Sequence, residues 1–160
     1  MQVIETRKRV LEAEHPDILS SMVNLALTFL SQGQWKEAQE LLVQVIELCK
    51  KVFGVEHPNT LISMANLALT YRNQEQWKNA EELEMQVIET RKRVLGAEHS
   101  DTLTSMVNLA LTYRNQGQWK NAKELEIQVM ETRKRVLGAE HPDTLTSMAN
   151  LALMCRNQEW

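Results

Sequence analysis

A repeat of 42 residues runs through the chain and constrains its fold more than any other feature. Residues 58–99 and 100–141 differ at only eight of 42 positions. Such self-similarity means that each repeat folds by the same local physics as the next, and that neighbours bury one another's apolar faces. The sequence therefore predicts a stack of like modules. The residues that recur at this step include His15, His57, His99 and His141, and Trp35, Trp77 and Trp119.

Each repeat contains two amphipathic helical segments. Apolar side chains recur at helical spacing along one arc of residues 58–73, which we name the A helix, and along one arc of residues 77–95, the B helix. Pro58 suits the first turn of the A helix, and Gly96 suits the end of the B helix. With only 5 glycines and 3 prolines in the chain, helix is expected almost throughout.

The link between the two helices is short. It consists of residues 74–76, and its middle position is Gly33 or Gly117 in other repeats but Glu75 here. Glycine is favoured where the backbone must adopt a positive φ, so Glu75 is predicted to carry a small strain.

The repeat resembles the tetratricopeptide repeat. The resemblance rests on the pattern Asn66-Leu67-Ala68-x-x-Tyr71-x-x-x-Glu75-x-Trp77-x-x-Ala80. The run Arg-Val-Leu-Gly-Ala-Glu-His at 93–99, followed by Ser-Asp-Thr-Leu, is similar to the longer 42-residue class. That class occurs in kinesin light chains and in the C-terminal arrays of fungal and bacterial NTPase-type immune receptors. The resemblance implies a protein-interaction scaffold whose A helices line an inner, concave wall.

Together these features predict an all-α fold: a right-handed superhelical solenoid of antiparallel helix hairpins, with about eight helices. One repeat domain is expected over residues 1–160. Residues 1–11 align with 85–95, the second half of a B helix, and the chain ends in a lone A helix. The expected divisions are a partial repeat at 1–14, full repeats at 15–56, 57–98 and 99–140, and a partial repeat at 141–160.

One face of the A helix carries almost no charge and is rich in asparagine. Around Asn66 lie Asn59, Ile62, Ser63, Leu69, Thr70 and Asn73. An asparagine amide can donate to and accept from one peptide unit, so a row of them suits the backbone of an extended peptide. The alternative is that each asparagine bonds a neighbouring helix and orders the stack. The candidate peptide-binding residues are Asn24, Asn66, Asn108, Asn150, Leu69, Leu111, Arg72, Asn73, Arg114, Asn115 and Arg156.

Three of these candidates are arginines at the edge of that face. Arg72, Arg114 and Arg156 could select acidic ligand residues through forked hydrogen bonds. The alternative is that each arginine lies along the apolar turn beneath it.

Two positions on the core-facing arc of the B helix change together. They are Glu84 and Arg91 in one repeat and Glu126 and Arg133 in the next, but Leu42 and Cys49 in the first. The covariation predicts a partly buried ion pair, within the helix or between repeats, that is exchanged for apolar contact in the first repeat. Loss of one partner should cost several kcal/mol.

The residues offer no recognisable catalytic or metal chemistry. One histidine per repeat leaves histidines roughly 10 Å apart, too far to share a zinc ion, so they are expected in the turn before each A helix. Cys49 and Cys155 are expected to be buried. The methionine series is expected to fill the core; it comprises Met22, Met64, Met106 and Met148. We therefore expect no enzyme, cofactor or metal.

Charge and hydropathy limit the partners. The formal net charge is −3 and no apolar run approaches 18 residues, so neither a nucleic-acid nor a membrane partner is expected. A cytoplasmic protein is expected. The basic triplets, such as Arg133-Lys134-Arg135, allow an RNA-binding repeat as a lesser alternative, but i,i+4 pairs such as Glu131–Arg135 explain them better.

The main prediction is a scaffold that binds an extended peptide or protein segment, acidic in preference, along the A helices. The alternative is a structural spacer, or an array that assembles head to tail through its incomplete ends and holds no peptide.

Overall fold

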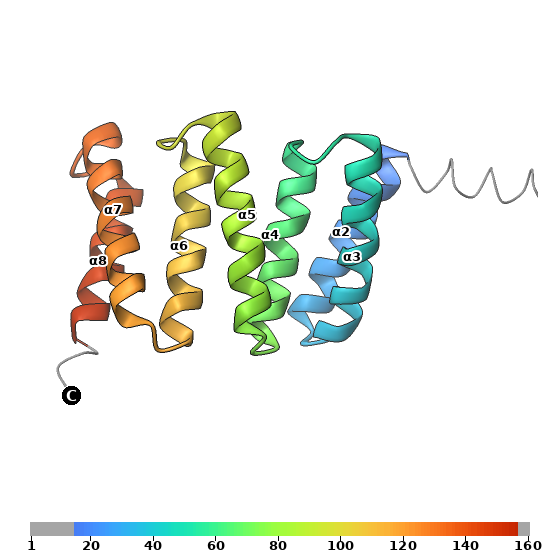
Figure 1. Ribbon diagram of the computed structural model, residues 1–160, viewed down its shortest axis with the longest axis horizontal. Coiled ribbons are helices and arrows are strands. Elements are labelled where there is room, and N and C mark those ends of the chain that lie inside the picture. The colour runs from blue at the N-terminus through green and yellow to red at the C-terminus, as the bar shows by residue number, and fades with distance from the viewer. Residues whose placement is uncertain (1–14, 157–160) are drawn as a thin grey trace, which may run out of the picture. The chain divides into compact units, whose positions relative to one another are not determined.

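The computed structural model describes residues 15–156, which form seven α-helices and no strand (Figure 1). The all-α prediction is confirmed, and the A and B helices expected at 58–73 and 77–95 have those bounds. The half B helix expected near the start falls within residues 1–14, outside the described residues. The helices are α2 (Pro16–Ser31), α3 (Trp35–Val52), α4 (Pro58–Asn73), α5 (Trp77–Leu95), α6 (Ser100–Asn115), α7 (Trp119–Leu137) and α8 (Pro142–Arg156).

The chain divides into two compact units between Leu83 and Glu84, within α5. In the first unit, α3 packs against both α2 and α4, and in the second, α7 packs against both α6 and α8. Successive helices within each unit run antiparallel (Figure 1). Each unit is thus built from A helices and B helices in alternation, as the sequence predicts.

The recurring histidines begin the A helices, as expected. The imidazole Nδ1 of His99 accepts a hydrogen bond from the backbone N–H of Asp101 at 3.2 Å, and His15, His57 and His141 cap their helices in the same way. The first N–H groups of a helix lack partners within the helix, so this acceptor satisfies one of them. The histidine series therefore has a local structural role.

The middle residue of each A–B link adopts a positive φ. Glu75 has φ 60°, beside 74° for Gly33 and 77° for Gly117, which confirms the left-handed conformation on which the predicted strain at Glu75 rests. In all three links, the N–H of the following glutamine returns to a carbonyl of the A helix, as from Gln76 to Tyr71 at 2.8 Å. The chain thus turns within three residues at the cost of one left-handed residue.

Exchanging residues between these links isolates the cost of that conformation. Glu75→Gly is expected to raise the free energy of unfolding by up to about 1 kcal/mol, because glycine relieves the left-handed strain. The reciprocal Gly117→Glu should lower it by about the same amount, since no atom lies within 4 Å of a Cβ built there and strain is the main cost. Urea unfolding followed by circular dichroism measures both. Changes of the same sign would contradict the account.

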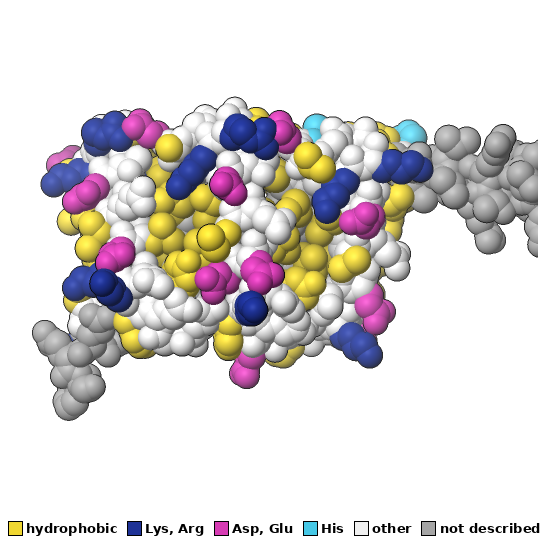
Figure 2. Space-filling model, in the orientation of Figure 1, with side chains coloured by type: hydrophobic (Ala, Val, Ile, Leu, Met, Phe, Trp, Pro, Cys, Tyr) yellow, Lys and Arg dark blue, Asp and Glu magenta, His cyan; other side chains and the backbone are white. Residues whose placement is uncertain are grey.

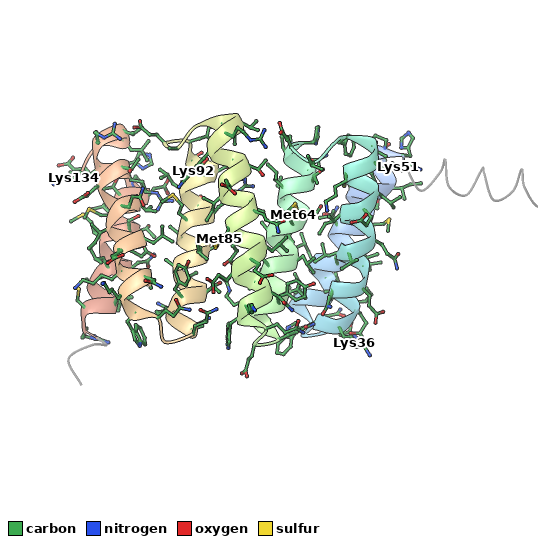
Figure 3. All side chains as sticks on the ribbon, in the orientation of Figure 1. Lys36, Lys51, Met64, Met85, Lys92 and Lys134 are labelled. Atoms are coloured by element: carbon green, nitrogen blue, oxygen red, sulfur yellow. The ribbon has the colours of Figure 1, made fainter. Side chains whose placement is uncertain are left out.

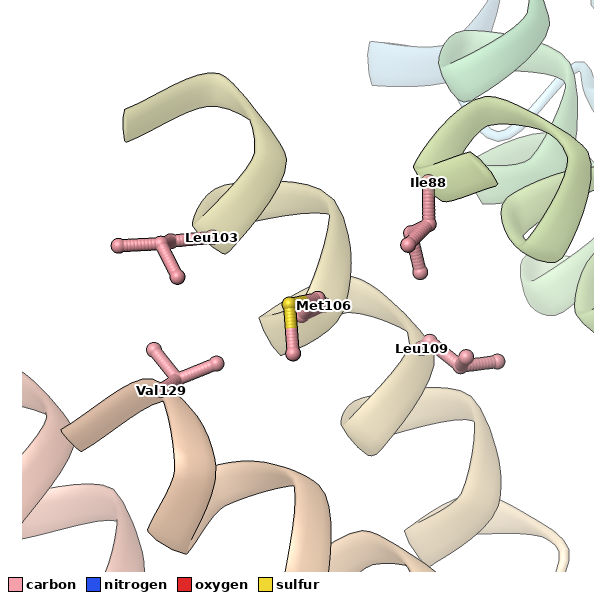
Figure 4. Close-up of a cluster of buried hydrophobic side chains, with 5 residues drawn as sticks. All are labelled: Ile88, Leu103, Met106, Leu109 and Val129. Carbon is pink, nitrogen blue, oxygen red and sulfur yellow. The ribbon is translucent and has the colours of Figure 1, made fainter. Parts of the chain in front are cut away.

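Each unit has its own apolar core. In the first, Leu19 of α2 packs with Val45 and Cys49 of α3. In the second, Leu103, Met106 and Leu109 of α6 pack with Ile88 of α5 and Val129 of α7, and Val129 points toward Leu103 and Met106 (Figure 4). In the second unit, α6 is thus covered on one side by its own B helix, α7, and on the other by the preceding B helix, α5.

The methionine and cysteine predictions hold only in part. Met64 and Met106 are buried, whereas Met148 of α8 is 47% exposed. Cys49 is buried, but Cys155 of α8 is exposed, so that prediction is wrong. The physical reason is shared: α8 is the last described helix, and within residues 15–156 no B helix follows to cover it.

A buried threonine lies near the start of α4, α6 and α8, and in α4 and α6 its hydroxyl caps the preceding B helix. The hydroxyl of Thr60 donates to the carbonyl of Gly54 at 2.8 Å, and that of Thr102 donates to the carbonyl of Gly96 at 2.9 Å. Thr144 is equally buried, but its hydroxyl has no hydrogen-bond partner. The three threonines occupy the same repeat position.

This difference makes a matched pair of variants. Thr102→Val is expected to lower the free energy of unfolding by about 1 kcal/mol, since it removes a buried hydrogen bond to the Gly96 carbonyl. Thr144→Val should be neutral or slightly stabilising, because no bond is lost. Chemical denaturation with a fluorescence readout compares them. An equal loss in both would show that side-chain shape, and not the hydrogen bond, sets the effect.

Arg135 departs from the pairing expected for it. The side chain of Arg135 on α7 forms its ion pair with Glu98, in the loop before α6, and not with Glu131 one turn away. This contact lowers the pKa of the Glu98 carboxyl, mainly through its hydrogen bond to Arg135.

The basic ends of the B helices carry exposed cations, as Lys51 of α3, Lys92 of α5 and Lys134 of α7 show (Figure 3).

Candidate functional site

The candidate peptide-binding side chains all lie at the surface of the A helices, exposed or half-buried. Asn24 is exposed on α2, while Asn66, Asn108 and Asn150 are half-buried on α4, α6 and α8. Leu69 and Leu111 are half-buried, and Asn73 and Asn115 are exposed at the helix ends. An amide at such a position can reach a ligand while its helix stays packed.

The uncharged face is narrower than the sequence suggests. Ser63 and Thr70 of α4 are fully buried, although we expected both on that surface. Their hydroxyls donate to the carbonyls of Asn59 and Asn66, one turn back in the same helix, at 2.9 and 2.8 Å. Because these bonds satisfy the hydroxyls internally, both residues can lie in the packed interior.

A hollow of about 170 Å³ lies between α2, α4 and the end of α3 in the first unit. Asn24 and Asn59 line it with their amides, and Val23, Ile62 and Phe53 supply apolar walls. A depression that combines a few amides with apolar side chains can hold one ligand side chain and bond the adjoining backbone. The hollow therefore brings one predicted candidate, Asn24, together with the A helix of the next repeat.

The sequence does not single out Phe53 as a lining residue. Phe53 lies in the turn after α3 and stacks on His57, with ring centroids 4.5 Å apart. The equivalent residues in later repeats are Leu95 and Leu137. The signal was thus a departure from the repeat: an aromatic residue at one position that is otherwise leucine.

A second hollow, of about 370 Å³, lies between α6 and α7 in the second unit. Leu109, Tyr113 and Leu125 line it with Asn121 and Gln128. Hydrophobic side chains gather over this region in the space-filling view (Figure 2). It contains none of the candidate residues, so it is separate from the asparagine row.

The three arginines at the edge of the face differ in their surroundings. Arg156 is exposed, while Arg72 and Arg114 are half-buried. The positive charge of Arg114 lies close enough to the buried Glu126 of α7 to favour its ionised form. Arg114 therefore has an internal electrostatic role, and Arg156 is the arginine most open to a ligand.

The acid and base predicted as a pair are buried, but each arginine bonds elsewhere. Arg133 donates to the Ser147 hydroxyl at 2.8 Å and to the Asp143 carbonyl at 3.3 Å, both on α8. Arg91 meets Ser105 and Asp101 on α6 in the same way. No described ion pair joins Glu126 to Arg133. The arginine thus holds its B helix to the next A helix.

The burial of Glu126 is electrostatically unfavourable. Only 1% of it is exposed, and its Oε2 atom has no hydrogen-bond partner. Burial raises the pKa of the Glu126 carboxyl above its ordinary value, and the charges of Arg133 and Arg114 offset part of that rise. Glu126 and Arg133 therefore interact through their charges, without a direct hydrogen-bonded ion pair.

The first repeat fills the same positions with apolar residues. Leu42 and Cys49 are fully buried. The Cys49 thiol is hydrogen-bonded to Ser63, the residue equivalent to Ser105 and Ser147. Burial raises the pKa of this thiol, and the bond to Ser63 opposes the rise. The contact between a B helix and the serine of the next A helix is thus kept in the first repeat, although cysteine replaces arginine there.

The described residues also bear on metal binding and on membrane crossing. Among residues 15–156, no three side chains of the metal-ligating types lie together. No described helix has the length and apolar character that a membrane crossing needs.

Comparison with known proteins places the repeat in a family. Family models described as Tetratricopeptide repeat match residues 1–51, 17–93 and 102–143. A comparison with curated proteins finds no match.

Solved structures of similar fold include proteins from two organisms. One is a Podosopora anserina protein with nearly identical TPR-like repeats, provisionally named a kinesin light chain. A substituted form of it superposes with a TM-score of 0.81 at 37% identity over 97% of this chain and 73% of that one. Another structure of it gives 0.77 at 38% identity over 88% and 66%. BtubC (BKLC) from P. vanneervenii gives 0.80 at 17% identity over 94% and 62%, a likeness of fold alone.

Proposed function

Because this chain belongs to the tetratricopeptide-repeat family, we propose that it binds an extended protein segment along its A helices. Repeats of this family generally mediate protein–protein interaction, and the fold is typically a non-enzymatic scaffold. The observation that carries the proposal is the hollow in the first unit, where Asn24 and Asn59 from successive A helices line one depression with apolar walls.

The chemistry of the row suits peptide backbone. Each amide can bond one peptide unit as donor and acceptor, and the half-exposed leucines beside it can contact alternate side chains. In the first unit, α2 contacts α4. Packed helices lie about 8–10 Å apart and an extended strand rises about 3.3 Å per residue, so each of these two repeats would hold about three ligand residues. An uncharged face also avoids the desolvation cost of binding against fixed charges.

The test removes two asparagine amides from the A helices, and its control removes two asparagine amides from the B helices. Asn24→Ala with Asn66→Ala, both in the first unit and with Asn24 in the lining of the hollow, should weaken binding roughly tenfold or more, since each lost hydrogen bond contributes about 1 kcal/mol. Asn79→Ala with Asn121→Ala, on the exposed surface of α5 and α7, is the matched control and should bind normally. The probe is a fluorescein-labelled peptide of about 12 residues selected from a phage library on the whole chain, with anisotropy as the readout.

The same variants decide between a scaffold and a spacer. If the first pair loses stability in urea but keeps peptide binding, the asparagines order the stack and the groove proposal is wrong. If the library yields no peptide that binds the whole chain, the spacer alternative is favoured.

We extend the proposal to acidic selectivity through Arg156, the exposed arginine. Arg156→Gln should weaken the binding of an acidic peptide more than the binding of the same peptide with its acidic residues replaced by amides. Added salt should reduce this difference in affinity. Equal loss of affinity for both peptides would contradict a role of Arg156 in selecting acidic residues.

A cytoplasmic location also stays a prediction. Cys49 and Cys155 are both free thiols, which suits a reducing compartment.

A further inference from the structure

The last A helix leaves bare a face that the same residues bury elsewhere. Leu103 and Met106 of α6 are 3% and 2% exposed, whereas the equivalent Leu145 and Met148 of α8 are 51% and 47% exposed. On α6 this face is covered by α7, whose Val129 points toward Leu103 and Met106 (Figure 4). Helix α8 therefore presents a surface shaped to receive the C-terminal half of a B helix.

The first A helix leaves bare the opposite kind of face. Leu25 of α2 is 48% exposed, whereas the equivalent Leu109 of α6 is 6% exposed. On α6 this second face is covered by the preceding B helix, α5, through Ile88. Within residues 15–156, no B helix precedes α2 to supply this contact.

One segment of this chain matches both missing covers. Residues 1–11 are identical to 85–95 of α5, and they differ from 127–137 of α7 only at their first and fourth positions. Val3 corresponds to Val129, which covers the first kind of face, and Ile4 corresponds to Ile88, which covers the second. A B helix in a repeat array contacts both faces at once, because it lies between its own A helix and the next.

We propose that residues 1–11 of one copy pack on α8 of a second copy, with Val3 against Leu145 and Met148. The same segment would present Ile4 to Leu25 of its own α2, so one helix turns two bare faces into one interior. The contact is heterologous, and its repetition joins chains head to tail. Burial of large apolar side chains drives it, as it does between α6 and α7. This inference does not depend on peptide binding by the asparagine row.

The wild-type chain should associate as its concentration rises. We expect the weight-average mass in sedimentation equilibrium to increase steadily from micromolar to millimolar protein, as open-ended assembly requires. Met148→Glu should abolish the increase, because a buried carboxylate on that face is unfavourable. The matched control is Thr146→Glu, which adds the same charge to an exposed residue of α8 whose α6 equivalent, Thr104, is also exposed.

A mixing experiment identifies the segment that binds. Val3→Glu should also be monomeric, with Gln2→Glu as its control, because the glutamines equivalent to Gln2 are exposed on α5 and α7. An equimolar mixture of the Val3→Glu and Met148→Glu chains should form a complex of about twice the monomer mass and no larger, since each contributes one intact surface. Circular dichroism verifies that both variants are folded.

The remaining outcomes overturn the proposal. If the wild-type chain stays monomeric at millimolar concentration, a second copy does not cover the α8 face. That face is then covered by another part of the same chain, covered by a different protein, or left exposed. Association that survives both variants uses another surface. Variants that are monomeric alone and remain so when mixed do not meet through these two surfaces.

Discussion

Replacing Arg133 by cysteine is expected to lower the free energy of unfolding by about 3–5 kcal/mol. The substitution removes hydrogen bonds to Ser147 and to the Asp143 carbonyl on α8, and it takes from the buried Glu126 the larger of the two positive charges that favour its ionised form. Removing a positive charge that acts on a buried carboxylate is costly because the carboxylate stays desolvated.

The first repeat supplies the compensating change. Leu42 and Cys49 occupy the same positions without any charge, and Cys49 meets Ser63 as Arg133 meets Ser147. The double variant Glu126→Leu with Arg133→Cys should therefore unfold close to wild type, or above it. Glu126→Leu alone should cost less than Arg133→Cys, because Arg133 keeps both acceptors on α8. Urea denaturation of the four proteins gives the coupling energy directly.

The pH dependence of the single variant has a definite sign. The pKa of Glu126 lies above its ordinary value in the folded protein because burial disfavours the charge. Folded protein therefore binds this proton more readily than unfolded protein, and the resulting stability is present below the ordinary carboxyl pKa and lost as pH rises through the folded value. In Arg133→Cys that pKa should rise further, so the deficit relative to wild type should shrink as pH falls from 7 toward 4.5. A deficit independent of pH would assign the loss to packing alone.

Truncation of the same leucine should lower stability by very different amounts in two equivalent helices. Leu103→Ala on α6 is expected to cost about 2–5 kcal/mol, because the side chain is 3% exposed and its removal leaves a cavity against Met106 and Val129. Leu145→Ala on α8 should cost less than about 1 kcal/mol, because its side chain is already half in water. The measurement is thermal and urea unfolding at low micromolar concentration, where chains are separate.

The Leu145 result also depends on concentration. At millimolar protein, Leu145→Ala should weaken the association proposed for the α8 face, while Leu103→Ala should act only on folding. If both substitutions cost the same at low concentration, the α8 face is covered in solution even in the single chain.

Local features of the fold were predictable from the sequence because they depend on neighbours within a few residues. Helical periodicity placed both helices of the hairpin at their observed bounds, and the recurring glycine predicted the positive φ of Glu75. The histidine before each A helix was expected in that turn. Its use of Nδ1 as the cap was a detail of geometry.

Parts of the candidate site were beyond sequence reasoning because packing decides them. Ser63 and Thr70 share the uncharged arc of α4 with Asn66, yet both are buried while Asn66 is half-exposed. Periodicity locates an arc on a helix, but it does not say where a neighbouring helix ends its contact. The bonds from Arg133 to Ser147 likewise join residues in different helices, and covariation with Glu126 pointed to a nearer partner.

The amino-acid sequence by itself determined the module: two helices, a left-handed turn, a capped start, and its repetition every 42 residues. Only the tertiary structure decided which copies of that module are buried. Leu103 and Leu145 occupy the same position in nearly the same helix, but one is in a core and the other in water. Hydrophobic burial is a property of what lies opposite a side chain, and a repeat cannot encode that within itself.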